Sequence, residues 1–211
     1  GDSVTLHPKA IHGFVGAEGI LDQRCMVLMD PKFFDDCRFQ IWNQNQYSAA
    51  KELHEWKLFM EQMETSTVDN SEDAENSVGS FEEVDIFEAE DEHEETFDEN
   101  SQRARVLQSL AKAKVNEKRL NDNYMKQLIG NPIKYGSIVQ LRHVKSGRFV
   151  TVCGLETADV ERENLRVYLD EEGSAMSWFV LAPRFKIDRD GNAINSSAEM
   201  YLKTAEGQNQ Y

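Results

Sequence analysis

The fold of this chain is decided by one stretch of its sequence, Tyr135-Gly-Ser-Ile-Val-Gln-Leu-Arg-His-Val-Lys-Ser-Gly-Arg-Phe-Val-Thr-Val152. Two short segments within it, Ile138–Leu141 and Phe149–Val152, have the apolar composition and length of strands. The turn between them contains Gly147, which can adopt a positive φ without steric strain. The stretch therefore predicts a β-hairpin.

Short strands are indicated elsewhere in the chain as well. Leu165–Asp170 and Ser177–Leu181 follow the hairpin, and residues 1–47 contain several short apolar segments bounded by Gly, Asp and Pro. Cys37–Trp42 alternates between apolar and polar side chains, so we expect a half-buried strand there. Many short strands at such spacing are typical of a β-sandwich or a closed barrel.

The pattern changes to a helical period after residue 47. Ser48 is a candidate N-cap, and an apolar face follows it at steps of three and four residues. A second helical segment runs from about residue 101 to residue 129 and ends before Gly130-Asn131-Pro132. Two helices inserted between strands predict a helical arm on a β domain. The apolar face of the first helix consists of Leu53, Trp56, Phe59, Met60 and Met63.

The second helix also has a basic face, formed by Arg103, Arg105, Lys112, Lys114, Lys118 and Arg119. Basic amphipathic helices bind calmodulin or membrane surfaces, so calmodulin is a candidate partner. The alternative is that Leu110, Leu120 and Leu128 pack on Trp56 and Phe59, and that the basic side chains remain in water.

The net charge of −15 comes from one segment of the chain. Residues 61–102 contain 17 acidic residues and neither Lys nor Arg, so the remainder is nearly neutral. Because like charges at this density repel and no periodic apolar face accompanies them, we expect residues 65–100 to be a disordered acidic link. The chain is thus divided into the first part of a β domain (1–47), a helical arm insertion (48–130) and the continuation of the β domain (131–211).

The sequence lacks the common catalytic and metal-binding motifs. It contains no phosphate-binding loop, nucleophile elbow, dinucleotide fingerprint or zinc-protease motif, and we expect a protein that is not an enzyme. Its three cysteines, Cys25, Cys37 and Cys153, lie far apart and predict free thiols rather than disulfides or a zinc site. No run of about 18 apolar residues is present, so this segment is not expected to enter a membrane.

Together, these blocks resemble the N-terminal suppressor domain of the inositol trisphosphate receptors, which are tetrameric, ligand-gated calcium-release channels. The resemblance covers nearly the whole chain apart from the acidic tract, and it is strongest in the hairpin stretch of residues 135–152. The other matching blocks occur in the same order as in the family; they are residues 1–6, 19–25, 36–39, 47–51, 166–171 and 177–179.

The resemblance implies a MIR-like β-trefoil that carries a helix-turn-helix arm. It also implies a domain on the cytosolic face of the endoplasmic reticulum that packs against the ligand-binding core following it and against neighbouring subunits of a homotetramer. Such a domain lowers the affinity of the core for inositol trisphosphate and couples ligand binding to gating. Inositol 1,4,5-trisphosphate would bind the downstream core, so no cofactor is expected in this chain, although Ca²⁺ is a candidate regulator. Nucleic acid is not an expected partner.

The contact positions of the family correspond to two sets of residues here. The interface with the ligand-binding core would use Ile20, Leu21, Asp22, Arg24 and Lys145. The loop that touches a neighbouring subunit would consist of Pro183, Arg184, Phe185, Lys186 and Ile187. The family commonly has Tyr in place of Phe185 and often Arg in place of Gln46, so a hydroxyl and a charge are missing here. Phe185 could instead fold back onto Trp178.

Three other families or functions would account for part of this sequence pattern. One is the equivalent domain of a ryanodine receptor. Another is the luminal MIR-type module of a protein mannosyltransferase, which an uninterrupted trefoil would favour. The third is a free-standing calcium or calmodulin-binding adaptor, which would require the arm helix to bind by itself. The third leaf of a trefoil would begin near Met200 and remain incomplete at Tyr211, so we expect the chain to be part of a longer polypeptide.

Overall fold

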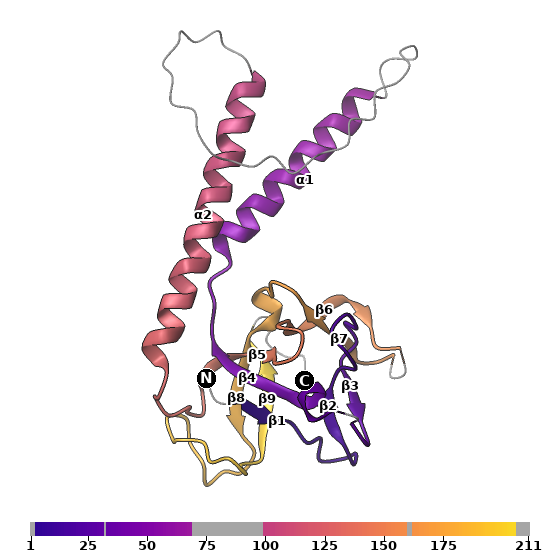
Figure 1. Ribbon diagram of the computed structural model, residues 1–211, viewed down its shortest axis with the longest axis vertical. Helices are drawn as coiled ribbons and strands as arrows, with labels where there is room; N and C mark the ends of the chain where they lie inside the picture. Colours follow the sequence, from indigo (N-terminus) through magenta and orange to yellow (C-terminus); the bar gives the residue numbers. More distant parts are fainter. Residues whose placement is uncertain (1–2, 32, 69–98, 160–161, 206–211) are drawn as a thin grey trace. The chain divides into compact units, whose positions relative to one another are not determined.

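The computed structural model of the chain describes residues 3–31, 33–68, 99–159 and 162–205. It divides into two compact units, one formed by residues 1–47 and 118–211 and the other by residues 48–117. The first unit contains the strands, and the second unit is helical (Figure 1). Most of the predicted acidic link lies outside the described residues, and its disorder stays a prediction.

The strands of the first unit pair in antiparallel fashion. One sheet has the order β1-β4-β5-β6-β7, with β8 beside β5 and β9 beside β8, while β2 and β3 form a separate pair. The fold is β-trefoil-like, with a helical arm inserted between β4 and β5, as the sequence predicts. The strands are β1 Ser3–Thr5, β2 Phe14–Gly16, β3 Met26–Leu28, β4 Arg38–Asn43, β5 Ile138–His143, β6 Phe149–Thr157, β7 Leu165–Asp170, β8 Phe179–Pro183 and β9 Met200–Thr204.

The predicted hairpin is formed by β5 and β6. Arg142 pairs with Phe149 across it, and Gly147 has a φ of 72° in the turn. The amide of Gly147 donates to the carbonyl oxygen of His143 at 2.9 Å. A side chain at position 147 would be strained at this φ, which explains why glycine occupies the turn.

The core of the first unit is built from residues of β4 to β8. Phe39 and Leu169 are fully buried, and Leu141, Val150 and Phe179 pack with them. Complete burial of such side chains contributes about 1.5–3 kcal/mol each. β4 buries Phe39 while its other side chains are half-buried, which confirms the half-buried strand expected for Cys37–Trp42.

A buried amide fastens the segment after β4 to the sheet. Gln140 of β5 is fully buried; its Nε2 donates to Tyr47 Oη at 2.7 Å, and its Oε1 accepts from the amide of Asn45 at 3.0 Å. The indole Nε1 of Trp178 donates to the carbonyl oxygen of Asn45 at 3.1 Å. Because these polar groups satisfy one another, Gln140 can occupy the interior without the penalty of an unpaired amide.

The second unit consists of α1 (Ser48–Val68) and the part of α2 (Glu99–Leu128) up to residue 117. The two helices approach each other at the first turns of α1 (Figure 1). There the carboxylate of Glu117 accepts from Ser48 Oγ at 2.8 Å and from the amides of Ala49 and Ala50 at 3.1 and 3.2 Å. The first turn of α1 is thus capped by Glu117 of α2, whereas the sequence predicts Ser48 as the cap.

The apolar residues of α2 divide between two places. Val106 and Leu110 line a groove together with Trp56 and Phe59 of α1, as predicted for Leu110. Leu120 and Leu128 belong to the first unit and instead line a cavity with residues of β4 and β5. The sequence pattern could not separate these two groups, because both fall on the same helical face.

Candidate functional site

A rigid turn between β2 and β3 carries four of the predicted interface residues. Ile20 and Leu21 lie at its tip and are exposed, with 84% of the Leu21 surface accessible. Gly19 precedes them with a φ of 80°, a conformation that favours glycine. Two large apolar side chains held in water at the tip of a turn are typical of a contact surface rather than of a folded core.

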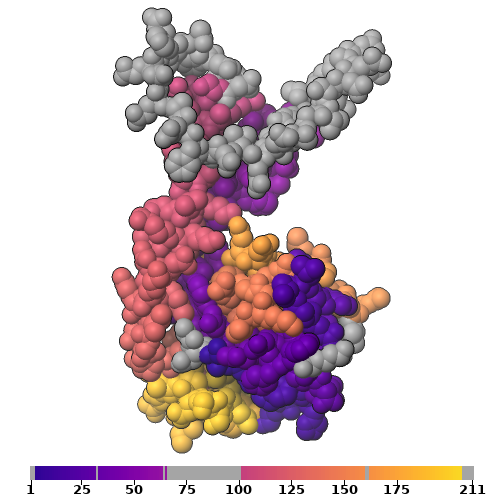
Figure 2. All heavy atoms as spheres, in the orientation of Figure 1, coloured from indigo at the N-terminus to yellow at the C-terminus, as the bar shows by residue number. Residues whose placement is uncertain are grey.

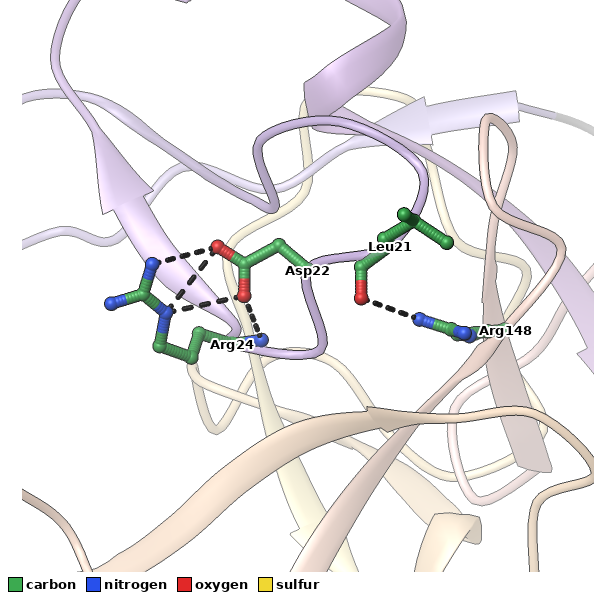
Figure 3. A network of polar contacts seen from close by, with 4 residues as sticks. All are labelled: Leu21, Asp22, Arg24 and Arg148. Carbon is green, nitrogen blue, oxygen red and sulfur yellow. Dashed lines mark hydrogen bonds and ion pairs between the residues drawn. The ribbon is translucent and has the colours of Figure 1, made fainter.

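The turn is stiffened by a charge pair (Figure 3). Asp22 Oδ1 accepts from the amide of Arg24 at 2.9 Å, and the Arg24 guanidinium binds both carboxylate oxygens at 2.9–3.3 Å. The hydrogen bonds from Arg24 lower the pKa of the Asp22 carboxyl group. The pair therefore remains ionised at neutral pH and fixes the direction of the loop that follows Leu21.

The base of the same turn is tied to the β5–β6 turn and to β7. Arg148, at the end of the β5–β6 turn, donates from Nη1 to the carbonyl oxygen of Leu21 at 3.0 Å (Figure 3). The amide of Leu169 in β7 donates to the carbonyl oxygen of Gln23 at 2.7 Å. Through Arg148, the turn of Ile20–Arg24 is connected to the turn that carries Lys145.

Lys145, the fifth predicted interface residue, is held by the short helix η1 (Phe34–Cys37) and the residue before it. Its Nζ lies 2.6 Å from Asp36 Oδ1 and 4.8 Å from the centre of the Phe33 ring. The Asp36 side chain is only 5% exposed, whereas that of Lys145 is 25% exposed. Phe33, beside the Lys145 ammonium group, and Phe34, the next residue, are both exposed.

His143 lies beneath this turn and is fully buried. Its Nε2 is 3.1 Å from the backbone oxygen of Asp36, and its Nδ1 is 2.9 Å from Ser146 Oγ. A carbonyl oxygen only accepts hydrogen bonds, so Nε2 carries the proton; in the neutral ring Nδ1 then accepts from the Ser146 hydroxyl. Burial lowers the pKa of His143, while the hydrogen bond to the backbone of Asp36 and the Asp36 carboxylate oppose this shift and the Lys145 ammonium group adds to it.

This pKa shift predicts an acid-sensitive fold. An imidazole in the unfolded chain has a pKa of about 6.5, above that of buried His143. As the pH falls below about 6.5, the unfolded chain takes up the proton first, so the free energy of unfolding should decrease. Calorimetric melting between pH 8 and pH 5 should show this decline in the wild type and a flatter profile in His143→Gln. Equal slopes for the two proteins would contradict the prediction.

The predicted inter-subunit loop follows β8. Phe185 is 50% exposed and Ile187 is 86% exposed, while the Arg184 guanidinium lies 5.4 Å from the centre of the Phe185 ring. Arg184 also contacts the Glu199 carboxylate, which binds Lys9 Nζ at 3.2 Å. The Trp178 ring is instead paired with Tyr47 at 6.2 Å. Phe185 is thus presented to solvent rather than folded onto Trp178.

The contact between Lys9 and Glu199 joins segments from the two ends of the described chain. In Figure 2 the C-terminal residues of the first unit (yellow) accordingly lie beside its N-terminal residues (indigo). The hydrogen bond with Lys9, followed by the charges of Arg184 and Lys9, lowers the pKa of Glu199. Glu199 therefore anchors the loop after β8 as an ionised group at neutral pH.

The two predicted surfaces lie at opposite ends of β5. β5 and β8 are antiparallel, and Val139 near the start of β5 pairs with Phe179 at the start of β8. The end of β8, and the loop that follows it, therefore extend past the first residue of β5. Lys145 follows the other end of β5, about 17 Å away for a strand of this length. The domain could therefore contact two different partners at the same time.

A cavity of about 950 Å³ lies between the end of α2 and strands β4 and β5. The described residues that line it are apolar or carry amides and hydroxyls, and none of them is charged. Such a lining cannot neutralise a ligand that bears several phosphates. In the described part of the chain, no group of three or more His, Cys, Asp or Glu is arranged to bind a metal ion.

The three cysteines are free thiols, as predicted. Cys37 is buried, while Cys25 and Cys153 are partly buried. Desolvation raises the pKa of the Cys25 thiol to about 12, so this thiol stays protonated and unreactive. Within the described ranges, neither α1 nor α2 combines the length and the apolar composition that a membrane span requires.

Comparisons with known proteins place these observations in a family. The family model described as inositol 1,4,5-trisphosphate/ryanodine receptor matches residues 1–209. The inositol 1,4,5-trisphosphate receptor itr-1 of Caenorhabditis elegans is 30% identical over 214 residues, a match that covers 96% of this chain. The chain spans about 6% of the length of that receptor.

Proposed function

Because the chain belongs to the inositol 1,4,5-trisphosphate/ryanodine receptor family, we propose that it is the non-catalytic regulatory domain of an intracellular calcium-release channel. In this role it packs against a ligand-binding core elsewhere in the receptor and lowers the affinity of that core for inositol trisphosphate. Through the domain, ligand binding at the core is then coupled to opening of the channel gate.

The observation that carries this proposal is the joined surface at one end of β5. The exposed side chains of Ile20 and Leu21 stand on a turn fixed by the Asp22–Arg24 pair, and Arg148 connects that turn to Lys145. A surface that is ordered before binding loses little conformational entropy in the complex. The residues expected to contact the core therefore form one preassembled surface.

The loop Pro183–Ile187 is proposed to contact a neighbouring subunit of a homotetramer. Phe185 and Ile187 are exposed there, and Arg184 holds the loop through Glu199. Aromatic and Arg side chains are enriched among the residues that dominate interface energies. The separation of this loop from Lys145 lets one domain couple its own core to the next subunit.

We place the domain on the cytosolic face of the endoplasmic reticulum, as part of the whole channel. The equivalent domain of a ryanodine receptor is the second candidate, since the family model covers both kinds of receptor. The match to itr-1 favours the inositol trisphosphate branch. Calmodulin binding by the basic face of α2 stays a prediction.

The proposal is tested by calorimetric titration of inositol trisphosphate into three proteins: this domain, the core of the same receptor, and the two joined. We expect no binding to the domain, because its charged groups are internally paired on the surface described above. The joined protein should bind more weakly than the core, by about 5–150-fold if the coupling is of typical size.

Two outcomes would overturn the proposal. Equal affinities of the core and the joined protein would exclude suppression. Binding of inositol trisphosphate to the isolated domain would assign it a ligand site of its own. A core that binds no inositol trisphosphate, alone or joined, would favour the ryanodine receptor alternative.

A further inference from the structure

The residue that holds the proposed core surface together is not itself part of that surface. His143 is fully buried, yet its two ring nitrogens contact two separate elements. Nε2 donates to the backbone oxygen of Asp36 in η1 at 3.1 Å, and Nδ1 accepts from Ser146 Oγ in the β5–β6 turn at 2.9 Å. The imidazole therefore bridges the helix that binds Lys145 and the turn that carries it.

The bridged turn controls both halves of the surface. Lys145 precedes Ser146 and pairs with Asp36, while Arg148 follows it and holds the carbonyl oxygen of Leu21. The amide of Arg148 lies 3.4 Å from Ser146 Oγ, and the amide of His143 donates to the carbonyl oxygen of Arg148 at 2.7 Å. A change at the imidazole is thus transmitted to Lys145 and to the Ile20–Arg24 turn together.

We propose that neutral His143 is the positioning residue of the core interface, and that it presents Lys145 and Leu21 in register by joining Asp36 to Ser146. This inference rests on the proposed function, since it concerns the same surface. His143 touches neither ligand nor partner and acts through the turn alone. Its role requires the tautomer with the proton on Nε2, which the carbonyl oxygen of Asp36 selects.

Protonation of the ring would disturb this arrangement at two points. A proton on Nδ1 would reverse the bond with Ser146, whose hydroxyl hydrogen would then need another acceptor. A second cation beneath the turn would also compete with Lys145 for the Asp36 carboxylate. The other groups around the ring are the Phe39 side chain of β4, the backbone of Asp35 in η1 and the carbonyl oxygen of Arg148 in the turn.

The experiment measures a suppression ratio, the dissociation constant of inositol trisphosphate for the joined domain and core divided by that for the core alone. His143→Gln keeps an amide that can donate to Asp36 but has no titrating proton and no acceptor at the Nδ1 position. We expect this variant to reduce the ratio about fivefold, or to one, at pH 7.5. His12→Gln changes an exposed histidine of the same unit and should leave the ratio unchanged.

The pH profile separates positioning from a general effect on folding. The wild-type ratio should hold near neutral pH and fall only as the pH drops below the pKa of His143, which burial lowers from its ordinary value, whereas the ratio of His143→Gln should not change as the pH is lowered. Any effect of pH on the core or on inositol trisphosphate cancels in the ratio. Ser146→Ala, which removes the partner of Nδ1 from a half-buried turn, should lower the ratio even if His143→Gln does not fold.

The outcomes distinguish this inference from the proposed function. A wild-type ratio of one would remove the suppressor function and this inference with it. A wild-type ratio above one that is retained in folded His143→Gln and in Ser146→Ala would overturn the positioning role alone. A ratio that falls with pH equally in the wild type and in His143→Gln would do the same.

Discussion

Replacement of Gly16 by alanine should lower the free energy of unfolding by about 3 kcal/mol, the upper end of what overpacking a core usually costs. A Cβ atom at this position would lie 2.3 Å from the carbonyl oxygen of Asp36 and 3.0 Å from the sulfur of Cys37. The oxygen belongs to the backbone, so it cannot rotate away as a flexible side chain would.

The damage should also reach the candidate interface. The same oxygen accepts hydrogen bonds from the amide of Ala17 at 3.0 Å and from His143 Nε2 at 3.1 Å. A shift of η1 that relieves the clash would weaken both bonds and move Asp36 away from Lys145. Gly16→Ala should therefore lose stability and the proposed suppression together.

Gly154→Ala is the matched control for this prediction. Its Cβ would lie 3.6 Å from the terminal methyl group of Met176, which is ordinary van der Waals contact. Urea unfolding should place this variant within about 0.5 kcal/mol of the wild type. If Gly16→Ala proves as stable as Gly154→Ala, the close approach of β2 to η1 is not a real constraint.

The parts of the fold that could be predicted from the sequence depend on neighbouring residues. The hairpin of β5 and β6 follows from two apolar segments and the glycine at 147, all within 18 residues. The arm follows from a change of hydrophobic period after residue 47. In both cases the local pattern and the tertiary structure favour the same conformation, so the local pattern alone is sufficient to predict the element.

The contacts that organise the candidate site join residues that are distant in the sequence. Lys145 and Asp36 are 109 positions apart, and Arg148 and Leu21 are 127 positions apart. Lys145 was assigned to the interface by family resemblance, but no sequence period indicates that Asp36 is buried against it. Asp36, His143 and Arg148 were therefore missed as members of the site.

The start of α1 shows the same limit of prediction from local sequence. Ser48 has the composition of an N-cap, yet the carboxylate of Glu117 accepts from the first amides of α1. A carboxylate is a stronger acceptor than a hydroxyl and favours the positive end of the helix dipole. Because Glu117 lies on another helix, local sequence gives no sign of it.

Lys145→Met should be the most damaging change at the surface itself, with a loss of about 3 kcal/mol in the free energy of unfolding. The variant leaves the Asp36 carboxylate, 5% exposed, without its ammonium partner. Asp36→Asn should lose only about 1 kcal/mol, because the remaining Lys145 ammonium is 25% exposed and can reach water. The unequal burial of the two partners therefore predicts unequal losses.

The double variant Lys145→Met/Asp36→Asn completes the cycle. It removes both charges and should be more stable than Lys145→Met alone, since no buried carboxylate is left unpaired. Arg38→Met serves as the control: its pair with Asp35 is solvent-exposed and should be worth less than about 1 kcal/mol. If the loss of stability in the double variant equals the sum of the two single losses, the Asp36–Lys145 pair contributes no coupling energy to the fold.

The same double variant separates the fold from the proposed function. It should regain stability without regaining suppression, because the ammonium group expected to face the ligand-binding core is still absent. Equilibrium binding of inositol trisphosphate to the joined domain and core would then give the affinity of the core alone. If suppression returned together with stability, Lys145 would act on the core only by holding η1 in place, and the contact surface would have to be sought in the exposed side chains of Ile20, Leu21 and Phe33.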